Sequence, residues 1–130
     1  MNIKEAQQKV KDFHLATGCY VGSIPHLPKQ SVLELRRTLA AEELFEQVEA
    51  EGRGDLGKAI DALGDRLYVL LGDCVAYGID IEPIFNEIHR SNMTKTIDGN
   101  FREDGKYLKG PSYEPPNLRP LIKAQGGSVW

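Results

Sequence analysis

The chain has 130 residues, of which 41% are hydrophobic, and its formal net charge is −3. This length suits one ordinary domain, and this apolar content is enough to bury a core without cross-links. The net negative charge would repel a duplex phosphate backbone, which argues against a nucleic-acid polymer as partner. No apolar segment reaches the roughly 18 residues of a membrane span, and the charged start MNIKEAQQKVKDFH is unlike a signal peptide. We therefore expect a cytoplasmic protein that binds neither membrane nor nucleic acid.

The first half of the sequence predicts two helices joined by an ordered loop. Residues 3–17 carry apolar side chains at helical spacing, and Gly18 is a plausible stop. Residues 18–30 contain two glycines and two prolines, which favour a loop rather than a strand. Ser31 is then the expected N-cap of a long second helix that ends at about Gly52.

Two further helices and an arm follow. Asp55 is placed to cap a third helix running toward Gly78, and its stretch 62–77 is apolar nearly all round, which indicates burial on several sides or a subunit interface. Asp80 is the expected cap of a fourth helix. After about residue 96 turn signals dominate, with one small hairpin expected around Asp104 and Gly105. The prediction is an all-α, four-helix single domain over 1–130, with a helical core over about 1–96 and an irregular C-terminal arm over about 97–130.

Acidic residues interrupt the apolar stripes of the second and third helices. On the second helix, the face of Leu35 and Leu39 continues into a carboxylate group at the same spacing, made of Glu42, Glu43 and Glu46. On the third helix, Asp61 and Asp65 lie one turn apart on an otherwise apolar segment. Five clustered carboxylates would repel one another strongly unless a divalent cation neutralised them.

Ligation by oxygen alone selects hard cations, so Mg²⁺ is the natural choice and Mn²⁺ the substitute. Both cations usually bind together with waters and substrate phosphates, so the pattern suits phosphate chemistry. The alternative is structural. Glutamates three and four residues apart are common on solvated helix faces, and Asp61 and Asp65 could lie on an exposed helix edge.

The fourth helix shows a similar change. Its apolar stripe continues into Ser91, Asn92 and Lys95, which could meet a phosphorylated ligand. An ordinary helix C-terminus, where polar and basic residues are favoured, explains the same residues. The three histidines have no metal-binding spacing and read as structural or surface residues.

The segments LRRTLAAEELFEQVEA and DALGDRLYVLLGDCVAYGID resemble the ExxE and ExxD half-motifs of MazG-like, all-α NTP pyrophosphohydrolases. The segments IHRSNMTK and DGKYLKGPSYEPPNL are similar to the phosphoribosyl-ATP pyrophosphohydrolase-like branch of that superfamily. The resemblance covers nearly the whole chain. It implies a four-helix module that forms homodimers or homotetramers and uses Mg²⁺ to hydrolyse nucleoside triphosphates to monophosphate and pyrophosphate.

Carried over residue by residue, the resemblance implies metal ligands at Glu43, Glu46 and Asp65, with Glu42 as their acidic neighbour. One position departs from the motif, because the first acidic residue of ExxD is Ala62 here. Asp61 lies on the same helical face as Asp65, so we expect it to assist as a ligand. The resemblance also implies that Glu42, Glu43 and Glu46 act in catalysis.

By the same resemblance, Asn92 and Lys95 would contact the nucleotide, and Lys106 and Lys109 could close over its phosphates. Solvated hairpin charges are the alternative for these two lysines. The expected function is therefore an NTP pyrophosphohydrolase of the nucleotide pool. The alternative is a nucleotide-binding or regulatory module of the same fold whose chemistry is impaired by Ala62.

Overall fold

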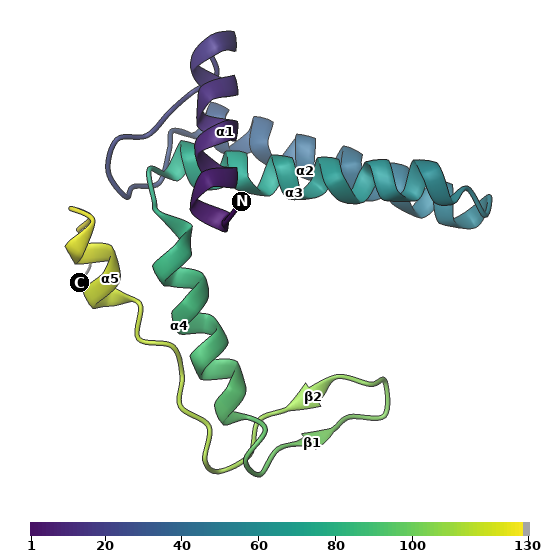
Figure 1. The fold of residues 1–130 in the computed structure, drawn as a ribbon, viewed down its shortest axis with the longest axis vertical. Helices are drawn as coiled ribbons and strands as arrows, with labels where there is room; N and C mark the ends of the chain where they lie inside the picture. Colours follow the sequence, from purple (N-terminus) through teal and green to yellow (C-terminus); the bar gives the residue numbers. More distant parts are fainter. Residues whose placement is uncertain (129–130) are drawn as a thin grey trace. The chain divides into compact units, whose positions relative to one another are not determined.

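The computed structural model describes residues 1–128, and among them the chain forms five helices and one two-stranded hairpin (Figure 1). The predicted all-α fold class is confirmed, and all four predicted long helices are present. None of the described helices is long and apolar enough to cross a membrane. The chain divides into two compact units, Met1–Ile79 and the segment that begins at Asp80. The organisation as one domain with a core and an arm stays a prediction.

The first unit contains α1 (Ile3–Thr17), α2 (Gln30–Gly52) and α3 (Leu56–Tyr77). α2 and α3 form an antiparallel pair that packs along its length, and α1 crosses this pair and packs on α3 (Figure 1). Small side chains dominate the buried contacts, so the helices approach closely. The buried apolar residues of this unit are Val10, Ala50, Ala62, Leu71, Cys74, Val75 and Ala76.

The ends of α3 agree with the local sequence signals, whereas the start of α2 does not. Asp55 accepts a hydrogen bond from the Lys58 amide at 3.0 Å, as predicted for an N-cap. The prediction that Ser31 caps α2 is wrong, because the helix begins at Gln30. The amide of Val32 already bonds to the carbonyl of Lys29, so Ser31 lies inside the first turn.

The loop between α1 and α2 is ordered, as predicted, and it is tied to the end of α3. The amide of Gly22 donates to the Val75 carbonyl and the amide of His26 to the Tyr77 carbonyl, both at 3.0 Å. A Cβ at residue 22 would lie 2.5 Å from the carbonyl oxygen of Ala76, so only glycine allows this approach. The loop therefore follows the surface of α3 without forming a strand.

The second unit contains α4 (Ile81–Thr94), β1 (Asn100–Phe101), β2 (Tyr107–Leu108) and α5 (Arg119–Ala124). Asp80 caps α4 by accepting from the Glu82 amide at 3.1 Å, as predicted. β1 and β2 pair in antiparallel fashion, which confirms the predicted hairpin; Gly105, in its turn, has a φ of 91°. The short helix α5 was not predicted.

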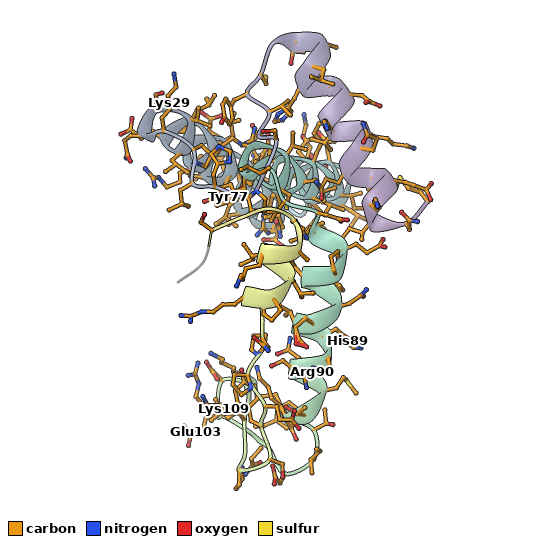
Figure 2. All side chains as sticks on the ribbon, turned by 90° about the vertical axis from the view of Figure 1, so that its left-hand side faces the viewer. Lys29, Tyr77, His89, Arg90, Glu103 and Lys109 are labelled. Carbon is orange, nitrogen blue, oxygen red and sulfur yellow. The ribbon has the colours of Figure 1, made fainter. Side chains whose placement is uncertain are left out.

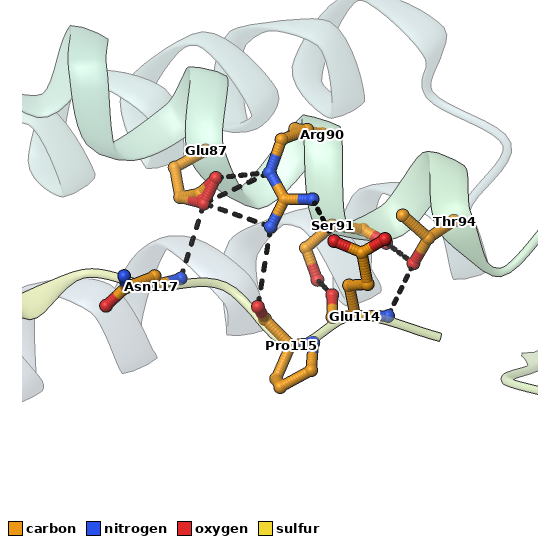
Figure 3. A network of polar contacts seen from close by, with 7 residues as sticks. All are labelled: Glu87, Arg90, Ser91, Thr94, Glu114, Pro115 and Asn117. Carbon is orange, nitrogen blue, oxygen red and sulfur yellow. Dashed lines mark hydrogen bonds and ion pairs between the residues drawn. The ribbon is translucent and has the colours of Figure 1, made fainter. Parts of the chain in front are cut away.

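Hydrogen bonds fasten the C-terminal arm to α4 (Figure 3). The buried hydroxyl of Ser91 donates to the Glu114 carbonyl at 2.7 Å, and the Glu114 amide donates to Thr94 Oγ1 at 2.9 Å. Arg90 binds the carboxylates of both Glu87 and Glu114. Ser91 thus has a structural partner, which explains why a polar residue continues the apolar stripe of α4.

Candidate active site

Of the five carboxylates of the predicted site, Glu43 is the one that is not exposed. The residue is partly buried between α2 and α3, and its Oε2 atom is buried with no hydrogen-bond partner among the described residues. A buried carboxylate oxygen without a partner is costly, because it loses its water and gains nothing in return. This oxygen is therefore suited to receive a ligand that bears protons or positive charge.

The pKa of Glu43 lies above its ordinary value, and the causes identify its neighbours. Burial is the largest cause, followed by the interactions of its carboxyl group with Glu46 and Asp65 and by the charge of Asp61. Each of these effects disfavours the ionised form of Glu43. The structure thus brings the four predicted metal ligands into one electrostatic environment, with two carboxylates from each helix.

The acidic residues share one side of the α2–α3 pair, which we call the acidic flank. On α2 it comprises Leu35, Leu39, Glu42 and Glu46, spaced four, three and four residues apart. On α3 it comprises Asp61 and, two turns later on the same face, Tyr68. The ring of Tyr68 meets the Phe13 ring of α1 edge-on, with the ring centroids 5.7 Å apart. α1 therefore packs on the acidic flank.

The donor set of this group consists of carboxylate oxygens, which is the chemistry that Mg²⁺ prefers. The unpartnered Oε2 of Glu43 also fits a cation, because a cation would stabilise the ionised carboxylate that burial and the neighbouring negative charges disfavour. No three His, Cys, Asp or Glu side chains within residues 1–128 already stand at metal-binding geometry. A bound cation would thus have to draw these carboxylates closer together, and their role as ligands stays a prediction.

Ala62 occupies the position at which the ExxD motif has its first acidic residue. Its side chain is only 2% exposed, so the motif position faces the interior of the helix pair. Asp61, one residue earlier, is exposed. An acidic residue at 62 would add a buried carboxylate close to the helix contact, whereas Asp61 reaches the group from its solvent edge.

The predicted substrate-binding residues lie in the second unit, where the structure groups two of the four. The ammonium groups of Lys95 and Lys109 lie 5.8 Å and 4.9 Å from the centre of the same Tyr113 ring, within cation–π range. Asn92 is exposed on α4, and Lys106 is exposed beside the hairpin turn.

Two residues of note were not singled out from the sequence. Tyr113 holds the lysine pair, and its only signal is an aromatic residue inside a proline-rich run. Arg36 is buried on α2, where Nε donates to Asp73 at 2.7 Å and Nη2 donates to the Val69 carbonyl at 2.6 Å. The sequence does contain a signal for a buried Arg36, because it lies one turn after Val32 on the inward face of α2.

Comparison with known proteins supplies the family. Residues 10–92 match the family model described as phosphoribosyl-ATP pyrophosphohydrolase. The match spans the second half of α1, all of α2 and α3, and most of α4. The match includes Asn92 and all five carboxylates of the predicted site, which are Glu42, Glu43, Glu46, Asp61 and Asp65. A comparison with curated proteins found no match. The chain belongs to the phosphoribosyl-ATP pyrophosphohydrolase family, within the MazG-like all-α superfamily.

Proposed function

We propose that this protein is a Mg²⁺-dependent pyrophosphohydrolase that converts nucleoside triphosphates to nucleoside monophosphate and pyrophosphate. Family membership supports a pyrophosphohydrolase-type activity. The observation that carries the finer proposal is the unpartnered, buried Oε2 of Glu43 inside a group of four carboxylates. Such a group is unfavourable by itself and becomes favourable once a divalent cation and a phosphate chain bind there.

Glu43, Glu46 and Asp65 would hold Mg²⁺, with Mn²⁺ as the substitute, and Asp61 would assist from the solvent edge. When bound, the cation neutralises negative charge on the phosphates and makes a nearby water more acidic. By holding that cation, the carboxylates of α2 and α3 would determine where the phosphate chain lies beside the helix pair. Because Ala62 removes one acidic position, we expect this chain to bind fewer cations than a site with the full motif.

Glu42 is the residue that we assign as general base. It lies on the acidic flank next to Glu43 but is exposed, so it can accept a proton from water. The water oxygen forms a bond to phosphorus, and the bond between the α- and β-phosphates breaks. The water's proton passes to the carboxylate, and pyrophosphate leaves with the electron pair of the broken bond. Glu43 and Glu46 would contribute to catalysis as ligands whose negative charge balances the charge of the bound cation.

The basic residues of the second unit would bind the phosphates. Lys95 and Lys109 are the stronger candidates, because their two positive charges already converge on one ring. An anion between them would relieve their mutual repulsion. Asn92 and Lys106 remain proposed contacts on the strength of the resemblance. A role in clearing unwanted nucleotides from the cytoplasm is the setting that this activity implies.

A second copy of the chain is the partner that we propose for the side of the α2–α3 pair opposite the acidic flank. This opposite flank holds a groove of about 480 Å³ lined mainly by Ala40, Ala41, Leu44, Leu63, Leu67 and Leu70. Leu67 and Leu70 are 55% and 57% exposed. An exposed apolar groove of this kind favours association, in line with the all-round apolar character of α3. A homodimer or homotetramer would bury it.

The second candidate function is nucleotide binding without turnover. The observation in its favour is that residue 62 faces the helix interior and carries no carboxylate. Loss of one ligand could leave a site that binds a nucleotide but positions the cation too loosely for hydrolysis. Binding that depends on Mg²⁺, without product, would support this alternative.

Product analysis separates the two candidates. The purified protein is incubated with Mg²⁺ and a panel of ribo-, deoxy- and modified nucleoside triphosphates together with phosphoribosyl-ATP. Pyrophosphate and monophosphate in equal amounts from a subset of the panel would support the proposal. No product with Mg²⁺ or Mn²⁺ from any member, together with measurable binding, would overturn it in favour of the binding module.

A further inference from the structure

The acidic flank contains a cavity that the carboxylate group does not use. It has a volume of about 380 Å³ and lies where the end of α1 and the following loop meet the first half of α2. This volume lies within the range of small-molecule sites. Its lining includes His14, Tyr20, Val32, Leu35, Arg36 and Leu39.

Internal bonds fix the polar floor of the cavity. His14 is 3% exposed, and its Nδ1 donates to the Tyr20 carbonyl at 2.9 Å. Arg36 is held by Asp73 and by the carbonyl of Val69. Both side chains therefore keep their orientation before any ligand arrives, which lowers the entropic cost of binding.

The lining of the cavity is poorly suited to a free phosphate. Val32, Leu35 and Leu39 make one wall apolar. Arg36 also lines the cavity, but its Nε atom lies 2.7 Å from Asp73 Oδ1, so its positive charge is already balanced. The lining also includes Tyr20, an aromatic residue of the type that stacks on planar groups. The cavity suits a neutral, partly aromatic group with a few hydrogen-bonding atoms.

The position of the cavity relative to the carboxylates completes the argument. Leu39 lines the cavity, and Glu42 and Glu46 follow it on the same flank of the same helix. Seven residues of α-helix separate Leu39 from Glu46, which is about 10 Å along the axis. A ligand that fills the cavity and also reaches the cation proposed at these carboxylates thus has a neutral, flat head and an anionic tail.

We propose that this cavity receives the nucleoside of the substrate, base and sugar together, while the phosphates extend along α2 toward Glu42 and Glu46. The inference rests on the proposed function and deepens it, because it assigns base specificity to the residues that line this cavity. Tyr20, from the loop after α1, and Leu35, from α2, then both contact the nucleoside.

The test fills the cavity with a large side chain. Leu35 is 54% exposed, so Leu35→Trp can enter the cavity without disturbing the buried core. Thr38→Trp is the matched control, because it adds the same ring to an exposed position of the same helix outside the cavity lining. Ser31→Trp, at a second exposed lining position, repeats the test if the first variant folds poorly.

Binding is measured by amide chemical shifts and calorimetry, with the four nucleoside monophosphates and with inorganic pyrophosphate as probes. We expect at least one monophosphate to shift the amides of His14, Tyr20 and Leu39. Leu35→Trp should weaken that binding at least tenfold and leave pyrophosphate binding unchanged, and Thr38→Trp should change neither. Unaltered monophosphate binding in both cavity-filling variants, shifts confined to other residues, or no binding of any monophosphate would overturn the inference.

The outcome is separable from that of the proposed function. If triphosphates are hydrolysed but Leu35→Trp leaves every KM unchanged, the function stands and the nucleoside assignment fails. If no triphosphate is hydrolysed but Leu35→Trp still abolishes monophosphate binding, the assignment stands and the hydrolase proposal fails.

Discussion

Arg36 of α2 and Asp73 of α3 form a part-buried ion pair with 2.7 Å between Nε and Oδ1. The arginine side chain is 10% exposed and the aspartate 29%. This pair joins the two helices at the end opposite their connecting turn, beside the proposed nucleoside cavity. The position of α2 relative to α3 therefore depends on it.

We predict that Asp73→Asn lowers the free energy of unfolding by roughly 3 kcal/mol, because it leaves a buried guanidinium without its counter-charge. Urea unfolding followed by circular dichroism measures this. Asp12→Asn, an exposed carboxylate on α1, is the control and should change the free energy by less than about 0.5 kcal/mol. Equal effects of the two substitutions would show that the pair does not stabilise the fold.

Two glycines of α3 should respond to alanine in opposite directions. A Cβ at Gly72 would lie 3.0 Å from both Arg36 Cζ and His14 Nε2, so Gly72→Ala should cost about 1–3 kcal/mol. A Cβ at Gly64 would meet nothing within 4 Å, so Gly64→Ala should stabilise the helix by about 0.5–1 kcal/mol. Thermal unfolding of both variants provides the measurement, and a stabilised Gly72→Ala would contradict the packing described.

The stability that Glu87 contributes should depend on pH. Its pKa is lowered from the ordinary 4.5, first by the hydrogen bond from Arg90 and then by the Asn117 amide. The folded state therefore favours the ionised form, so the contribution is present above pH 4.5 and is lost as the pH falls through the lowered pKa. The difference in unfolding free energy between wild type and Glu87→Gln should shrink on acidification.

The control for that experiment is Glu103→Gln, an exposed glutamate beside the hairpin turn (Figure 2). Its difference from wild type should stay flat over the same pH range. A Glu87→Gln difference that grows as the pH falls would mean that the carboxylate is not stabilised in its ionised form.

Self-association should depend on the flank opposite the carboxylates. Leu67→Glu places a charge in the apolar groove, and we expect it to convert a dimer or tetramer into a monomer. Leu15→Glu, at a leucine of α1 that is 62% exposed, should leave the mass unchanged. Sedimentation at micromolar concentration distinguishes these results. A wild-type protein that sediments as a monomer would remove the proposed interface.

Sequence patterns predicted the features of this fold that depend on local interactions. Asp55 and Asp80 were identified as helix caps because a cap bonds to amides within the next three residues. The local pattern that predicted Ser31 as the cap does not include the path of the preceding loop. That path makes α2 begin one residue earlier, at Gln30. The helix α5 was not predicted because the prolines that precede it indicate an extended chain. Pro120 lies in its first turn, a position at which proline is compatible with a helix.

The candidate site was predictable in its acidic members and not in its surroundings. Glu43 and Asp65 interrupt apolar stripes, which is a signal in one dimension. The pairing of Lys95 with Lys109 on Tyr113 depends on how the arm returns to α4, and no spacing encodes that path. The cavity beside Arg36 likewise requires three elements to meet, so it was visible only in the structure.

The most direct test of the central claim is pyrophosphate release from a nucleoside triphosphate, measured with Mg²⁺ for wild type, Glu46→Gln and Glu34→Gln. Glu34 is exposed on α2 away from the carboxylate group, so its substitution removes the same charge outside the site. The account predicts equal rates for wild type and Glu34→Gln and a loss of at least about 100-fold for Glu46→Gln, with its helical content unchanged. Full pyrophosphate release by Glu46→Gln would contradict the assignment of the active site to these carboxylates.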